Sequence, residues 1–124
     1  MAGSDILVVD DDADIRSALG QVLELEGYQV AYAANGREAW ASLQAGPPPR
    51  LVLLDLMMPV MDGAEFLRLL RGDGRLASLP VVLVSAFGSI AAAVAAAVQG
   101  QLRKPLDLDD LTGTVGRFCA PRSE

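Results

Sequence analysis

Five polar side chains follow the ends of short apolar runs in this chain, and all are of types that bind metal ions or phosphate. Three are the carboxylates of Asp10, Asp11 and Asp55, and the others are the Ser85 hydroxyl and the Lys104 ammonium. In a parallel α/β sheet, buried strands read as continuous apolar stretches, and ligands bind beyond the carboxyl ends of the strands. We therefore expect these side chains to converge on one pocket.

The three carboxylates would repel one another in a shared pocket unless a cation neutralises them. Mg²⁺, or Mn²⁺ in its place, prefers oxygen ligands in octahedral geometry and keeps several waters. We expect Asp11 and Asp55 to be direct ligands of this ion. The backbone carbonyl of Met57 would add a further ligand, and Asp10 would act through a water.

An oxygen of Asp55 that does not bind the cation could attack a phosphoryl group in line. The charge on the phosphoryl oxygens would then need stabilising, and the cation, the Ser85 hydroxyl and the Lys104 ammonium can do so from three sides. The product would be an aspartyl phosphate. The residue types therefore predict Asp55 as a phosphoacceptor.

Each of these residues also has a purely structural interpretation. One of Asp10, Asp11 and Asp12 could simply cap the helix that follows, which is a common role of Asp before an amphipathic stretch. Lys104 could be a solvated lysine before the turn that the next residue, a proline, predicts. Asp55 is harder to explain in this way, because a carboxylate directly after a buried strand is costly to bury unless it is paired. The joint occurrence of these residues favours the chemical interpretation.

The elements that must position these residues alternate between strands and helices along the chain. Short apolar runs predict five strands, at about residues 5–10, 28–33, 51–55, 80–85 and 101–103. Amphipathic or alanine-rich stretches predict five helices, at about residues 13–26, before Gly46, after Asp62, at 90–98 and after Asp107. Right-handed crossovers between the strands then give an α/β fold with a doubly wound parallel sheet.

Apolar spacing also predicts which faces of the first and last helices are buried. In the first helix the residues expected to point inward are Ile15, Leu19, Val22, Leu23 and Leu25, and Gly27 is expected to end the helix. In the last helix they are Leu108, Leu111, Val115 and Phe118.

Length and composition predict a single globular domain, residues 1–120, followed by a tail or the start of a linker at 121–124.

The net charge of −6 argues against direct binding to nucleic acid, and the absence of histidine excludes a His-based triad or zinc site. The longest apolar stretch, Ile90–Val98, is about half of what a membrane span requires. Because the N-terminus lacks a signal-peptide pattern and Cys119 is the single cysteine, we expect a cytoplasmic protein.

Four segments resemble the receiver (CheY-like) domains of bacterial two-component response regulators. They are Ile6–Asp12 (ILVVDDD), Leu51–Gly63 (LVLLDLMMPVMDG), Val82–Ser89 (VLVSAFGS) and Lys104-Pro105. The resemblance covers essentially the whole chain and implies a flavodoxin-like fold, with five helices around a five-stranded sheet of order 2-1-3-4-5. It implies a phosphohistidine donor on a sensor histidine kinase or phosphotransfer protein, and a downstream target protein or output domain. It also implies a chain that catalyses only its own phosphorylation and slow dephosphorylation.

The chain departs from the family pattern on the side expected to transmit the signal. Gln101 stands where most receivers have an aromatic residue that moves on phosphorylation, and the segment between Ser85 and Lys104 is shorter than usual. We therefore expect intact phosphorylation chemistry with an altered signalling surface. The positions that family behaviour links to phosphate lifetime hold two bulky apolar residues, Met57 and Phe87, which predicts slow dephosphorylation through exclusion of water.

The sequence leaves other functions open. A receiver-like module that binds partners without phosphorylation is favoured by Gln101 and the short segment, although all the acidic residues are retained. A hydrolase with an aspartate nucleophile would need a general acid close by, often two residues on, where this chain has Met57. The alanine-rich stretch at 90–98 is a candidate docking face for a partner or for a second copy of the chain, so that a homodimer is also open.

Overall fold

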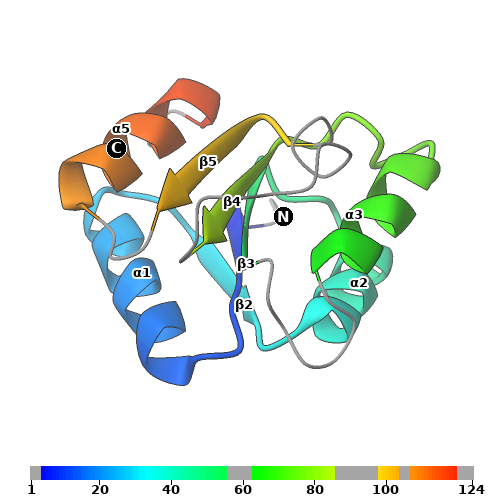
Figure 1. The fold of residues 1–124 in the computed structure, drawn as a ribbon, viewed down its shortest axis with the longest axis horizontal. Coiled ribbons are helices and arrows are strands. Elements are labelled where there is room, and N and C mark those ends of the chain that lie inside the picture. The colour runs from blue at the N-terminus through cyan, green and yellow to red at the C-terminus, as the bar shows by residue number, and fades with distance from the viewer. Residues whose placement is uncertain (1–3, 56–62, 86–97, 104–106, 120–124) are drawn as a thin grey trace.

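Parallel strands form the centre of the molecule, and helices cover both faces of their sheet (Figure 1). The structure is a computed structural model that describes residues 4–55, 63–85, 98–103 and 107–119. The strands are β1 (Ile6–Val9), β2 (Val30–Ala33), β3 (Leu51–Asp55), β4 (Val81–Ser85) and β5 (Gly100–Arg103). The helices of the described residues are α1 (Ala13–Leu25), α2 (Gly36–Ala45), α3 (Gly63–Gly72) and α5 (Leu108–Phe118). The predicted alanine-rich helix falls almost wholly on residues 86–97, which lie outside the described part.

The sheet has the order β2-β1-β3-β4-β5, which confirms the predicted doubly wound topology. β1 lies between β2 and β3, and Val9 is opposite Ala33 on one side and Leu54 on the other. On β4, Ser85 is opposite Arg103 of β5. The register therefore brings the carboxyl ends of all the strands to one edge of the sheet.

Alternate residues of the strands supply two separate hydrophobic cores. α1 and α5 cover one face of the sheet, and α2 and α3 cover the other (Figure 1). The core under α1 and α5 includes Ile6, Val8, Leu23, Leu53, Val82, Leu111 and Val115. The core under α2 and α3 includes Leu7, Val9, Leu43, Leu54, Phe66, Leu70 and Leu83. Burial of one such side chain stabilises the fold by about 2 kcal/mol, so the continuous apolar runs hold both layers on the sheet.

α1 has clear signals at both ends. The Asp12 carboxylate is the N-cap and accepts hydrogen bonds from the backbone N–H groups of Asp14 and Ile15. At the other end Gly27 has a φ of 98°, a left-handed conformation that glycine adopts without strain. Asp12 is therefore the residue of the acidic run that caps the helix, as one of the structural interpretations proposed. The helix also ends where the sequence predicts.

Two apolar residues that were expected to point inward are exposed. Leu25 is 87% exposed and Leu108 is 59% exposed. Leu25 follows buried Leu23 by two residues, which is about 200° around a helix, so the two cannot share a face. Leu108 is the first residue of α5, and helical side chains tilt toward the N-terminus, which directs this one off the end of the helix.

Polar contacts of Tyr28 and Asp5 join parts of the chain that are distant in sequence. The Tyr28 hydroxyl, just before β2, donates to the backbone carbonyl of Cys119 at the end of α5. Asp5, just before β1, is fully buried; its carboxylate accepts the Gln29 N–H at 2.9 Å and pairs with Arg50 at 3.4 Å. These contacts close the side of the fold at which β1 and β2 begin.

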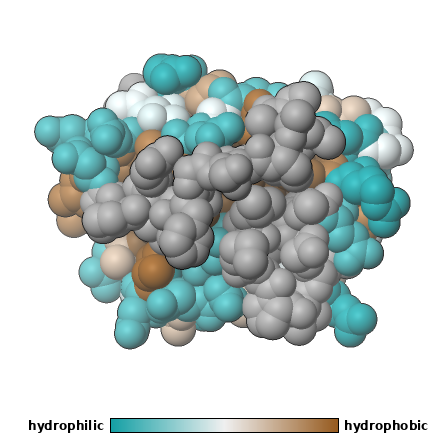
Figure 2. Space-filling model, viewed as in Figure 1, coloured by the Kyte–Doolittle hydropathy of each residue, from teal (hydrophilic) through white to brown (hydrophobic). Residues whose placement is uncertain are grey.

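Hydrophilic residues cover most of the described surface on the face shown in Figure 2, with small apolar patches between them. The large apolar side chains that are exposed among the described residues are Leu25, Tyr32 and Leu108. Within the same residues, no helix combines the length and the hydropathy needed to cross a membrane.

Candidate functional site

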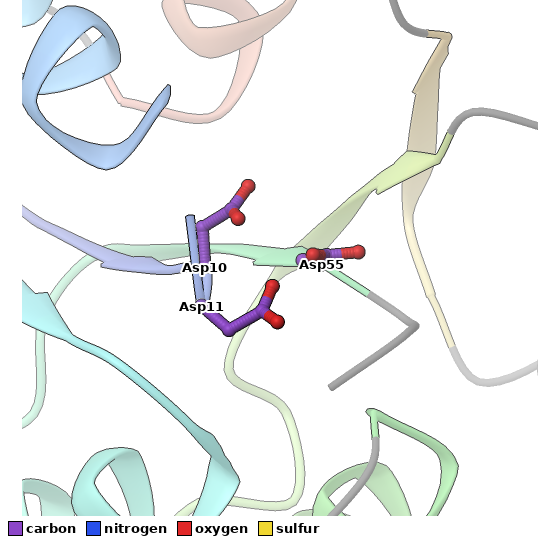
Figure 3. A group of neighbouring side chains, drawn as sticks. All are labelled: Asp10, Asp11 and Asp55. Carbon is purple, nitrogen blue, oxygen red and sulfur yellow. The ribbon is translucent and has the colours of Figure 1, made fainter. Parts of the chain in front are cut away.

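The neighbouring ends of β1 and β3 place three carboxylates together. Asp10 and Asp11 directly follow β1, and Asp55 is the last residue of β3. Carboxylate oxygens from the three residues lie within 4.8 Å of one another. Figure 3 shows the side chains gathered beyond the strand ends, with the carboxylate of Asp11 extended toward Asp55. The structure therefore brings together the acidic residues that the sequence predicts as one site.

The three carboxylates differ in their surroundings. Asp10 and Asp55 are buried, with 1% and 6% of their surface exposed, whereas Asp11 is exposed. Burial of a carboxylate is costly unless it is hydrogen bonded or paired with a cation. One oxygen of Asp10, Oδ1, accepts the backbone N–H of Asp12 at 3.0 Å. Asp10 thus already contributes to the turn after β1, while Asp11 and Asp55 approach each other across the site.

Backbone contacts hold the turn that carries Asp10 and Asp11. The N–H of Asp10 donates to the carbonyl of Ala33 on β2 at 3.1 Å. The carbonyl of Asp10 accepts a hydrogen bond from Nη1 of Arg16, in the first turn of α1, at 2.6 Å. Since Asp12 caps the same helix, the turn is fixed to β2 and to α1 together.

The group of donors suits a hard divalent cation. All three side chains offer carboxylate oxygens, the ligands that Mg²⁺ and Mn²⁺ prefer, and this chain has no histidine to add a softer nitrogen ligand. Three negative groups within 4.8 Å repel one another, and a cation would offset this repulsion. The residues present therefore fit Mg²⁺ or Mn²⁺.

Comparison with known proteins identifies the family. The family model for the response regulator receiver domain matches residues 6–116. The chain belongs to this family. The receiver domain is 40% identical over 119 residues to Response regulator Rre1 of Synechocystis sp., which covers 93% of the chain and 51% of Rre1. It is 39% identical over 123 residues to the DNA-binding transcriptional regulator NtrC of Rhizobium meliloti, which covers 97% of the chain and 25% of NtrC. The chain thus spans about half the length of Rre1 and a quarter of that of NtrC.

Solved structures show the same fold. The receiver domain superimposes on the chemotaxis protein CheY4 of Vibrio cholerae with a TM-score of 0.83 at 30% identity, covering 94% of this chain and 99% of CheY4. It superimposes on response regulator TrrA of Thermotoga maritima, solved in complex with Mg(2+)-BeF, with a TM-score of 0.82 at 31% identity, covering 91% of this chain and 96% of TrrA. The CheY-like fold that the sequence motifs imply is therefore confirmed.

The other predicted site residues of the receiver domain are described in part. Ser85 ends β4, next to the strand that carries Asp55, and so lies at the same edge of the sheet. Gln101, which the sequence predicts at an atypical switch position, lies on β5 and is exposed. Met57, Phe87 and Lys104 lie outside the described residues.

Sequence reasoning did not select Arg16 as part of the site of this receiver domain. Its guanidinium reaches back to the carbonyl of Asp10, six residues earlier. The available signal was its place in the chain: Arg16 is the fourth residue of α1, one turn after the N-cap Asp12. A long side chain on the first turn of a helix can reach the loop that precedes it.

Proposed function

We propose that this receiver domain accepts a phosphoryl group on Asp55 from a phosphohistidine of a sensor histidine kinase or histidine phosphotransfer protein. Phosphorylation would then change its contacts with a downstream protein or an output domain. The observation that carries the proposal is the position of Asp55, at the end of a central strand, 6% exposed and grouped with Asp10 and Asp11. Family membership supports the same function.

We propose that Mg²⁺, or Mn²⁺, is bound by Asp11, Asp55 and the backbone carbonyl of Met57, with Asp10 acting through a water. The burial of Asp10 and the exposure of Asp11 support this division of roles. The related TrrA structure was solved in complex with Mg(2+)-BeF. When bound, the cation would offset negative charge on the incoming phosphoryl group.

The residues of the chain account for the transfer itself. A carboxylate oxygen of Asp55 forms the new bond to phosphorus while the bond from phosphorus to the histidine nitrogen breaks, and the imidazole keeps the electron pair and takes up a proton. The Ser85 hydroxyl and the Lys104 ammonium would stabilise the charge on the phosphoryl oxygens. Because Asp55 is buried, few waters compete as acceptors.

The positions that tune and transmit the signal belong to the same proposal. Met57 and Phe87 would slow dephosphorylation by excluding water, and Gln101 would replace the usual aromatic switch residue.

Residues 1–120 would form the receiver domain and 121–124 a tail or the start of a linker. A single cysteine fits a reducing compartment, and we place the domain in the cytoplasm.

The intact mass of the chain after incubation with acetyl phosphate tests the proposal. We expect a gain of one phosphoryl group that requires Mg²⁺ and is lost in Asp55→Asn. Asp109→Asn is the matched control, since Asp109 is an exposed carboxylate on α5, and it should be phosphorylated like the wild type. If the wild-type chain gains no mass with or without Mg²⁺, the phosphoacceptor proposal is wrong and a receiver-like interaction module is the better explanation.

A further inference from the structure

Arg16 contacts the peptide unit that joins two of the acidic residues. The carbonyl of Asp10, which accepts the hydrogen bond from Nη1 of Arg16 at 2.6 Å, belongs to the peptide bond between Asp10 and Asp11. Rotation of this peptide plane changes the backbone angles on both sides of it. The ψ angle of Asp10 and the φ angle of Asp11 set how each side chain is directed relative to this plane. A donor that holds the carbonyl also holds the geometry of the two carboxylates.

Two other hydrogen bonds hold neighbouring groups of the turn. The hydrogen bond from Asp10 N–H to Ala33 fixes the peptide unit before Asp10, and the N–H of Asp12 fixes the carboxylate of Asp10 at 3.0 Å. Neither contact involves the Asp10 carbonyl. Hydrogen bonds from a charged donor are stronger than those between neutral groups, and the half-buried position of Arg16 limits competition from water.

We propose that Arg16 is a positioning residue of the acidic site: by holding the peptide plane between Asp10 and Asp11, it sets the arrangement of the carboxylates and so the affinity for Mg²⁺. For the role of the cation, the inference rests on the proposed function. Its effect on the turn does not depend on any bound ion. Arg16 itself contacts neither the phosphoryl group nor the cation in this proposal.

The charge of Arg16 would act on Mg²⁺ affinity in the opposite direction. A positive group beside the site repels a cation, so removal of the charge alone should tighten binding of Mg²⁺. Loss of positioning should weaken it. The sign of the change in affinity therefore separates positioning from simple electrostatics.

The test compares Arg16→Met with the wild type by titration calorimetry with Mg²⁺ and by amide hydrogen exchange of the metal-free chain. We expect Mg²⁺ to bind about tenfold more weakly to the variant, which corresponds to about 1.4 kcal/mol. We also expect faster exchange of the Asp12 N–H, with unchanged exchange in the β3 amides. Arg117→Met, an exposed site in the last turn of α5, removes the same charge and should leave both readouts unchanged.

Each outcome decides the inference. Tighter binding of Mg²⁺ to Arg16→Met, or unchanged affinity, would overturn it. If the wild-type chain binds no Mg²⁺, the cation part of the proposed function fails, and amide exchange alone then decides whether Arg16 holds the turn. Unchanged exchange at Asp12 overturns the positioning role in every case.

Discussion

Adjacent carboxylates in this receiver domain, Asp10 and Asp11, have different environments. Asp10 is 1% exposed and accepts a backbone hydrogen bond, while the next residue, Asp11, is exposed and extends toward Asp55. Successive side chains at the end of a strand point in different directions, so Asp10 is buried and Asp11 is exposed although both belong to the acidic cluster. The two residues therefore differ in what their loss should do.

Replacement of Asp11 by Asn should have opposite effects with and without the cation. In EDTA the variant should be more stable by about 1 kcal/mol, because one of three mutually repelling charges within 4.8 Å is removed from an exposed position. With Mg²⁺ at about 100 times its dissociation constant, the wild type should gain about 2.7 kcal/mol, and the variant much less. Urea denaturation in the two buffers measures both effects.

The control for this prediction is Asp14→Asn. Asp14 is an exposed carboxylate on α1 that does not belong to the cluster, so its variant should keep the full gain from Mg²⁺. If the Asp11 variant is less stable than the wild type in EDTA, Asp11 is not a repelling charge. If the variant gains as much stability from Mg²⁺ as the wild type does, Asp11 is not a ligand.

At the scale of elements, the glycines of α1 and α5 have opposite roles. Gly27 ends α1 with a φ of 98°, whereas Gly113 and Gly116 lie within α5, exposed, with open space where a Cβ would be. Alanine is favoured over glycine inside a helix by about 1 kcal/mol, while a left-handed conformation costs alanine about 1 kcal/mol or more. The same substitution should therefore change stability in opposite directions.

We predict that Gly113→Ala raises the free energy of unfolding by about 1 kcal/mol and that Gly27→Ala lowers it by at least as much. Chemical denaturation of the two variants beside the wild type measures these changes. Gly116→Ala should behave like Gly113→Ala, because it occupies an equally open position on the same helix. If both α5 substitutions lower the free energy of unfolding, the space beside Gly113 and Gly116 on this helix is not open.

The elements were largely predictable because their signals are local. The run Leu51–Leu54 followed by Asp55 predicted β3 with its observed bounds, and a turn of acidic residues followed by an amphipathic stretch predicted α1. The expected inward orientation of Leu25 was wrong, because Leu25 lies about 200° around the helix from buried Leu23 and is exposed. Burial of Asp5 also left no signal, since it depends on Gln29 and Arg50.

The acidic residues of the site were predictable from the sequence, but the contact that holds their turn was not. Residue types and strand ends identified Asp10, Asp11 and Asp55 as neighbours, because parallel strands end at one edge of a sheet. The contact of Arg16 with the backbone of Asp10 depends on how α1 leaves the turn, which no pattern of residue types records. Sequence patterns thus gave the acidic cluster but not the residue that holds its turn.

For the whole molecule, the hydrogen bond from Tyr28 to the Cys119 carbonyl joins residues 91 positions apart. Burial raises the pKa of the Tyr28 phenol above its usual value of 10.0, because the ionised form is poorly solvated there. A raised pKa in the folded state means that its stabilisation is full below pH 10 and is lost as the pH rises through the folded-state pKa. Stability of the domain should therefore fall in alkaline solution.

Tyr28→Phe should lower the free energy of unfolding by about 1 kcal/mol at pH 7, because the Cys119 carbonyl loses this donor. The difference from the wild type should shrink above pH 10, since only the wild type must keep a phenol protonated there. Denaturation curves at pH 7 and at several values above pH 10 test this. A difference that stays constant over that range would contradict the assignment of the alkaline loss to Tyr28.

The order β2-β1-β3-β4-β5 has a consequence for how the chain is made on the ribosome. The first strand to be synthesised lies in the interior, β2 joins one of its sides, and β3, β4 and β5 then join the other side in succession. Each nascent strand thus meets an edge that already exists, and no earlier pairing has to open to admit it. The sheet can grow during translation in the sequence of synthesis, with α5 sealing it last.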